Sequence, residues 1–260
     1  MYNQNGVYYS EQHSVSFGDL IDRTSHVDFN VAANTWEDWH LIPSSRLSIA
    51  HPNVVTNFIE LPGKGGMIDL TEAINKKPNY GQRQGSLGFI FDHHFGDVAT
   101  IYNSIVSMLH GKRIKLRMDD DPAYYYEGRF TVEALEYTDQ YPKITISYQL
   151  LPYKYKINTD GNRLVIWNTF NFLQDYDYSV FVNGVTVSNE TKTYDIYAKD
   201  YPFALSVTRV SGTVTVSFGG ETKTLSSSGT VEIGKASVGQ NELVISGNGK
   251  INIEWRGGSL

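Results

Sequence analysis

The chain has 260 residues, a formal net charge of −6 and no cysteine. The negative charge argues against a protein that grips nucleic-acid phosphates, and the absence of cysteine excludes disulfides and cysteine-ligated metal sites. The 18 Tyr and 12 Phe side chains favour pleated, half-buried surfaces, so the composition indicates a mostly β protein.

The first ten residues are polar and rich in tyrosine, and no apolar run reaches the ~18 residues of a membrane span. We therefore expect no signal peptide, no membrane association, and synthesis in a cytoplasm. A short strand is expected at 14–19. The stretch 22–52 that follows is weakly periodic and contains Trp36 and Trp39, and loops of this length are uncommon in compact domains and often functional.

Residues 53–61 look extended and lead into a glycine-rich turn at 62–66. The strongest helix signal is an apolar stripe at helical spacing over 97–110. Asp97 is placed to cap the N-terminus of this helix, and Gly111 is placed to end it.

Residues 113–118 alternate between basic and apolar side chains, which predicts a half-buried strand with a basic outer face. The turn 119–122, with three aspartates and a proline, ends this strand. Further strands are expected at 124–137 and 143–150.

The pattern changes after residue 155, where short strands alternate with tight turns as in a β-sandwich or jelly roll. Glycine-containing dipeptides predict hairpin turns at 183–184, 211–212 and 219–220. Apolar runs predict strands near 230–234, 241–246 and 250–255. We therefore divide the chain into two domains, 1–155 and 156–260.

Motifs for chemistry are weak. The adjacent pair His93-His94 converges poorly on one metal, because neighbouring side chains of an extended segment point apart. The aspartates at 119–121 lack calcium-loop spacing, and 63–66 lacks the features of a phosphate-binding loop. Paired carboxylates that meet only in space remain open. We expect no catalytic, cofactor-binding or metal-binding residues and no enzyme activity.

Several segments together resemble one protein family, the distal tail proteins of siphophages that infect Gram-positive bacteria. The order and spacing of the matching segments carry this resemblance, which is strongest over residues 14–155: Ser16–Asp19, Trp39–Pro43, Asn57–Gly63, Ile68–Glu72, Tyr80–Arg83, Leu109–Lys112, Asp119–Arg129, Leu151–Tyr155 and Ile253–Leu260.

The resemblance implies an N-terminal β-sandwich with one helix and an extended arm, followed by a galectin-like or jelly-roll sandwich. It implies a homohexameric ring at the virion tail tip, with a central channel through which DNA passes without specific binding. As a hub, such a ring joins the tail tube protein and the tape-measure protein to a tail-associated fibre or lysin and to a receptor-binding protein.

Two segments are candidates for the arm: 22–52, with its two tryptophans, and 62–84, with the glycine-rich turn. The interface candidates are therefore aromatic and apolar residues of these segments: Trp36, Trp39, Leu41, Ile42 and Tyr80. If 22–52 is the arm, replacing Trp36 and Trp39 together with alanine should weaken assembly more than it unfolds the domain. Two other functions are alternatives to the ring hub. One is a carbohydrate-binding accessory protein that acts through the C-terminal sandwich, and the other is a hydrolase of cell-wall glycans or peptides.

Overall fold

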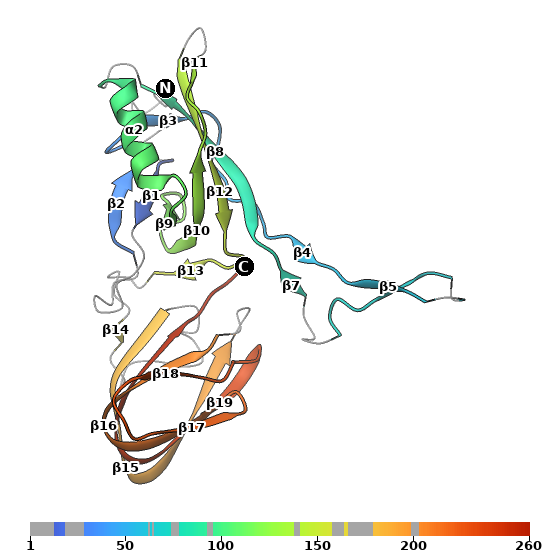
Figure 1. Cartoon of the computed structure of the whole chain (residues 1–260), viewed down its shortest axis with the longest axis vertical. Coiled ribbons are helices and arrows are strands. Elements are labelled where there is room, and N and C mark those ends of the chain that lie inside the picture. The colour runs from blue at the N-terminus through green and yellow to red at the C-terminus, as the bar shows by residue number, and fades with distance from the viewer. Residues whose placement is uncertain are drawn as a thin grey trace.

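The computed structural model describes residues 13–18, 29–61, 63, 65–73, 78–92, 96–137, 141–157, 164–165, 179–198 and 203–260. These residues form two large β-sheets, two small two-stranded ribbons and one helix (Figure 1). The predicted fold class, mostly β with a helix in the first half, is confirmed. The predicted pair His93-His94 lies outside the described residues.

The first sheet has nine antiparallel strands, with the order β2-β1-β9-β10-β12-β8-β3 and two further strands attached to β12 and β10. We call this sheet, with the helix α2 (Val98–Leu109), the first unit. Its strands are β1 (Val15–Gly18), β2 (Val31–Asn34), β3 (Leu41–Pro43), β8 (Arg83–Phe91), β9 (Arg113–Met118), β10 (Tyr124–Val132), β11 (Glu136–Tyr137), β12 (Pro142–Leu150) and β13 (Tyr155–Lys156).

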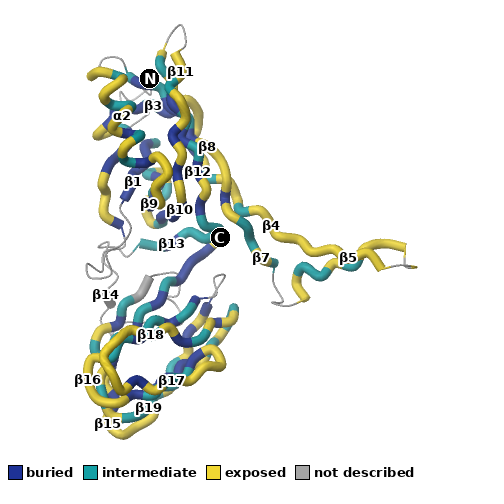
Figure 2. The backbone as a smooth tube through the Cα atoms, in the orientation of Figure 1, coloured by how far each residue is buried: buried dark blue, intermediate teal, exposed yellow. Residues whose placement is uncertain are grey.

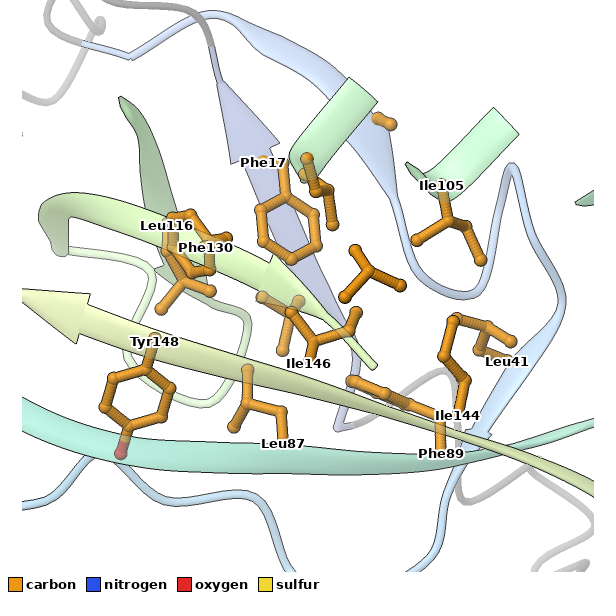
Figure 3. Close-up of a cluster of buried hydrophobic side chains, with 14 of the residues drawn as sticks. Phe17, Leu41, Leu87, Phe89, Ile105, Leu116, Phe130, Ile144, Ile146 and Tyr148 are labelled. Atoms are coloured by element: carbon orange, nitrogen blue, oxygen red, sulfur yellow. The ribbon is translucent and has the colours of Figure 1, made fainter. Parts of the chain in front are cut away.

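The core of the first unit lies between the sheet and the helix. Helix α2 contributes Ile105 and Leu109, both fully buried, while the sheet contributes side chains such as Phe17 and Phe130 from β1 and β10 (Figure 3). The rings of Phe17 and Phe130 meet edge to face, with centroids 5.4 Å apart. Because alternate strand residues point to one face, one apolar set per strand is enough to build this core.

The helix begins and ends where the sequence predicts. The side chain of Asp97 accepts hydrogen bonds from the hydroxyl and from the backbone N–H of Thr100, and these bonds, the hydroxyl's first, lower the pKa of the Asp97 carboxyl. After the helix, Gly111 adopts a positive φ of 71°, the left-handed conformation that commonly follows a helix end.

The expected basic outer face of β9 is wrong at one central position. Ile114 and Leu116 point into the core as predicted, but Lys115 on the opposite face is also buried. Its ammonium group lies 4.6 Å from the ring centroid of Tyr125, which belongs to a small aromatic cluster with Phe29 and Tyr155. Alternation correctly separates the two faces of β9, but it does not reveal that a second layer covers the polar face.

The second sheet, which we call the second unit, is built from unusually long strands. Three of them have 14 to 20 residues and bend, so that one half of β16 pairs with β17 and the other half with β18. Both halves therefore close on one core. The order is β14-β15-β19-β16-β17, with β14 (Leu164–Val165), β15 (Ser179–Ala198), β16 (Leu205–Phe218), β17 (Glu221–Leu225), β18 (Thr230–Ile233) and β19 (Gly239–Arg256).

Two of the three predicted hairpin turns in the second unit are wrong. The turn at 219–220 connects β16 to β17 as expected, but 183–184 and 211–212 lie within β15 and β16. Residues 183–184 form a register shift in the pairing with β19, and 211–212 directly follow the shift at Val210. Gly184 and Gly212 have positive φ values of 78° and 71°, which β-bulges require as often as hairpins do. The predicted strands 241–246 and 250–255 are correspondingly one continuous strand, β19.

Gly212 is expected to tolerate alanine poorly, because a Cβ there would lie 2.5 Å from the Cα of Gly249, its pairing partner in β19. Gly220 is a matched control: its φ of 81° is equally unfavourable for alanine, yet nothing lies within 4 Å of its Cβ position. We expect Gly212→Ala to lower the free energy of unfolding by about 2 kcal/mol more than Gly220→Ala. If urea unfolding showed the same loss of unfolding free energy for both variants, the close approach of the two strands at Gly212 would be contradicted.

The two cores share no residue: the first is formed by side chains between 15 and 150, and the second by side chains between 182 and 255. The chain crosses between the units twice. It passes from the first unit to the second after β13, and residues 257–260, which follow β19, return to the first unit. Lys154 and Ser259 form an antiparallel bridge there. The domain boundary at 155/156 stays a prediction.

A long segment between β3 and β8 projects from the first unit (Figure 1). It consists of two ribbons in series, one pairing β4 (Val54–Val55) with β7 (Asn79–Tyr80), the other pairing β5 (Phe58–Glu60) with β6 (Met67–Asp69). We call residues 53–81 the arm. The arm is the feature from which a candidate functional surface can be built.

Candidate assembly interface

The arm exposes apolar side chains along its length. Half of the exposed large hydrophobic residues in the described part of the chain belong to it, each with 42–66% of its surface accessible: Val54, Val55, Phe58, Ile59, Leu61 and Met67. Figure 2 shows the arm as a mostly exposed segment beside the buried strands of the first unit. Exposed apolar residues that gather on one projecting segment make it a candidate site of association.

The outer ribbon of the arm is apolar on both faces. Phe58 and Met67 lie on one face, because Met67 pairs with Glu60, which shares a face with Phe58 two residues away. Ile59 and its pairing partner Ile68 lie on the opposite face. An isolated two-stranded ribbon is marginally stable in water. The outer ribbon thus carries accessible apolar side chains on both of its faces.

The root of the arm is fixed to the first unit by Arg83, a buried residue at the start of β8. Its Nε donates a hydrogen bond to the carbonyl of Pro152 at 2.8 Å, and its Nη1 donates to the carbonyl of Ala50 at 3.0 Å. The guanidinium also lies over the ring of Tyr126, 5.4 Å from the centroid. Burial lowers the pKa of Arg83, opposed by Tyr126 and Tyr148, and an arginine remains charged in any case.

The two chain segments that enter and leave the arm are tied together at this root. The hydroxyl of Tyr148 accepts a hydrogen bond from the backbone N–H of Ala50 at 2.9 Å. The N–H of Gly81 donates to the carbonyl of Asn53 at 2.8 Å. Because both segments are held, the arm leaves the first unit in a defined direction even though its outer ribbon has no core.

Replacing Arg83 with methionine is expected to lower the free energy of unfolding by about 2 kcal/mol, because hydrogen bonds from a charged donor to two buried carbonyls are lost. Arg83→Lys is the matched control, since it keeps the charge but lacks the planar fork that reaches both carbonyls. In urea unfolding, the free energy of unfolding of Arg83→Lys should lie between those of the unaltered chain and of Arg83→Met. A methionine variant as stable as the unaltered chain would contradict this role.

Two of the five interface candidates lie in the core of the chain itself, and the interface role of all five stays a prediction. Trp39 is 4% exposed, and Leu41 is fully buried; both lie in the core of the first unit, where the Trp39 ring is 5.9 Å from the Phe17 ring. Trp36 is half-buried and packs edge to face on His40, while Ile42 is half-buried in β3. These four residues bury their rings and methyl groups within their own chain because the 29–52 segment wraps onto the sheet.

Tyr80 is the one candidate that belongs to the arm. It is half-buried, pairs with Val54, and its ring meets the ring of Tyr153 edge to face with centroids 6.3 Å apart. The second candidate arm, 62–84, overlaps the observed arm, which begins nine residues earlier, at Asn53. The exposed apolar residues of 54–61 were missed, because an extended apolar run looks the same whether its partner lies within the chain or outside it.

No described feature supplies the chemistry of an enzyme site. The carboxylate of Asp119 accepts hydrogen bonds from Ser16 and Asn34, and Asp121 pairs with Lys154 at 3.2 Å, so this acidic turn is satisfied by the chain itself. Among the described residues, no group of three or more His, Asp or Glu side chains is placed to hold a metal. The absence of catalysis stays a prediction.

The described part of the second unit exposes little of the aromatic surface on which sugars commonly pack. Among its described aromatic side chains, only Tyr197 is exposed, while Phe203, Phe218 and Trp255 stack in the core. Ligand sites are usually lined by accessible aromatic and apolar groups. The geometry therefore favours the arm over the second unit as the candidate functional surface. None of the described helices is long and apolar enough to cross a membrane.

No family model matches the sequence, and no curated protein matches it. Among solved structures, the chain is similar to the crystal structure of the Dit (gp 19.1) protein of phage SPP1, with a TM-score of 0.52 and 10% sequence identity. The match covers 95% of this chain and 99% of that one. That protein is described as a paradigm of the hub adsorption apparatus in phages that infect Gram-positive bacteria. At this identity the likeness shows a shared fold.

Proposed function

We propose that the chain is a structural hub of a phage tail tip and that it works by assembly rather than by catalysis. The observation that carries this proposal is a fold likeness spanning almost the full length of both chains, 95% and 99%. A single β-sandwich recurs with many functions, whereas a two-unit chain with a projecting arm is a far more particular arrangement. The resemblance of the sequence to distal tail proteins supports the same role.

In this proposal the chain forms a homohexameric ring in which the first unit, residues 1–155, surrounds a central channel. A ring of identical copies needs a head-to-tail interface that closes by rotation. The arm provides such an interface, because its two apolar faces are covered when it lies on the neighbouring copy. Interfaces of permanent complexes are large and relatively hydrophobic, which suits the exposed residues of 54–67.

The remaining partners follow from this position. The ring joins the tail tube protein and the tape-measure protein on one side to a tail-associated fibre or lysin and a receptor-binding protein on the other. The second unit, residues 156–260, lies at the periphery. The net charge of −6 supports passage of DNA without specific binding, because a basic channel would retain it electrostatically.

Native mass spectrometry and negative-stain microscopy of the purified chain test the proposal. We expect a closed six-membered ring with a central opening, formed by the chain alone or on mixing with its tail tube protein. Monomers under all of these conditions would contradict a ring-forming hub. Saturable binding of cell-wall glycans by the monomer would instead support the carbohydrate-binding alternative.

A further inference from the structure

Residues 152–155 lie between the arm and the second unit, and we call them the joint. Their contacts with the arm root are a hydrogen bond and a ring contact. The carbonyl of Pro152 accepts the bond from Arg83 Nε at 2.8 Å, and Tyr153 meets the ring of Tyr80, whose centroid is 6.3 Å away. The position of the joint therefore depends on the position of the arm root.

The same short segment also holds the residues that follow β19. Lys154 and Ser259 exchange two backbone hydrogen bonds, of 2.8 and 2.9 Å. Gly258 lies so close to the joint that a Cβ on it would be 3.2 Å from the Cβ of Tyr153 and 3.3 Å from the Cε1 of Tyr155. Ser259 is buried. The end of β19 is thus packed against the joint, which the arm root also contacts.

Arg256 fixes this end of β19 to the first unit. Its Nη1 forms an ion pair with the buried carboxylate of Glu127 at 2.6 Å, and its Nη2 donates to the hydroxyl of Tyr125 at 2.6 Å. Its guanidinium stacks over the ring of Tyr155 in the joint, 4.2 Å from the centroid. Burial alone would lower the pKa of Arg256, but Tyr125, Glu127 and Tyr155 together raise it.

Glu127 is in turn shared with β9, because Arg113 lies 2.7 Å from its other oxygen. This carboxylate is 4% exposed, so its two arginine partners compensate a charge that would otherwise be buried alone. The Arg256 cluster is consequently anchored in the middle of the first sheet. Any tilt of the second unit pulls on Arg256 and, through Tyr155, on the joint.

We propose that the joint couples the arm to the placement of the second unit, so that loosening either one loosens the other. The physical basis is that the joint is bound on both sides and cannot shift toward one without losing contacts with the other. This coupling is a property of the single chain and does not require a ring. In the proposed hub, it lets a neighbour that grips the arm set the orientation of the peripheral unit.

Hydrogen exchange of backbone amides in the full chain tests the coupling, because local opening reports on each side separately. Arg256→Gln removes the ion pair on the side of the second unit. We expect it to speed exchange of the Gly81 amide, at the arm root, by about fivefold, the lower end of couplings between linked sites. Tyr80→Ala, on the arm side, should speed exchange of the Ser259 amide by a similar factor.

The variant that combines Arg256→Gln with Tyr80→Ala provides the decisive measurement. Because coupling between sites is reciprocal and non-additive, its exchange rates should differ from the product of the two single effects. Tyr197→Ala is the control in the second unit, since this exposed side chain lies outside the joint, and it should leave the Gly81 amide unchanged. If Arg256→Gln unfolds the chain, Arg256→Lys keeps the charge and serves instead. The coupling would be overturned if Arg256→Gln left the Gly81 amide unchanged, Tyr80→Ala left the Ser259 amide unchanged, and the double variant showed only additive changes in exchange.

Discussion

Replacement of Phe58, Ile59 and Met67 by threonine should leave the chain monomeric with an almost unchanged melting temperature. Threonine retains the β preference of the arm while removing apolar surface from both faces of its outer ribbon. Burying one such side chain stabilises an interface by ~1.5–3 kcal/mol, so the triple substitution should weaken each contact by at least ~10³-fold. Surface changes of this kind shift the free energy of unfolding by only ~0.5 kcal/mol.

Tyr137→Thr is the matched control for the arm variant. Tyr137 is the most exposed large hydrophobic side chain in the described part of the chain, at 74%, and it lies on β11 rather than on the arm. Size-exclusion chromatography with light scattering should find rings for this variant and monomers for the triple variant. Rings of normal size from the triple variant would remove the arm from the assembly interface.

The elements that could be predicted from sequence are those whose signals are local. The helix 98–109 combines an apolar stripe with a capping aspartate, and both act within a few residues. The turn at 219–220 has two consecutive glycines with positive φ, and no other structure accommodates that pair as readily as a two-residue hairpin. In these cases local preference and tertiary packing agree, which makes the prediction reliable.

The errors occur where one local signal serves two structures. A glycine with positive φ closes a hairpin at Gly220 but lies within a continuous strand at Gly212, and the difference is that β19 continues alongside Gly212 as its pairing partner. Lys115 illustrates the same limit, because the cluster that covers it comes from Phe29, Tyr125 and Tyr155, far apart in the chain. Contacts of this kind cannot be inferred from spacing alone.

Of the two candidate arms, 22–52 packs on the sheet in its described part instead of projecting, and the reason is energetic. Tryptophans dominate many interfaces, which pointed to Trp36 and Trp39, but large aromatic rings also gain most from burial in a core. The projecting arm carries no tryptophan, and its exposed residues, such as Phe58 and Met67, lie in a segment whose sequence resembles any extended strand. What distinguishes the arm is the lack of a covering layer, and only the fold reveals that.

Trp39→Ala is therefore expected to destabilise the monomer rather than to prevent assembly directly. The ring is buried beside Phe17 and leaves a large cavity when it is removed, and such losses cost about 3–5 kcal/mol. The melting temperature of the first unit should fall by on the order of 10 °C, measured by circular dichroism. Rings should still form at temperatures where the variant is folded, because no arm residue has changed.

Trp36→Ala separates this explanation from a general effect of removing tryptophan. Trp36 lies three residues away, is half-buried, and packs on His40 at the edge of the unit, so its loss should cost only about 1 kcal/mol. If Trp39→Ala kept its melting temperature and lost the ring, Trp39 would have to leave the core on assembly. The triple arm variant should lose the ring and keep its melting temperature, whereas Trp39→Ala should lose melting temperature and keep the ring. These opposite results would assign stability to the 29–52 segment and association to the arm.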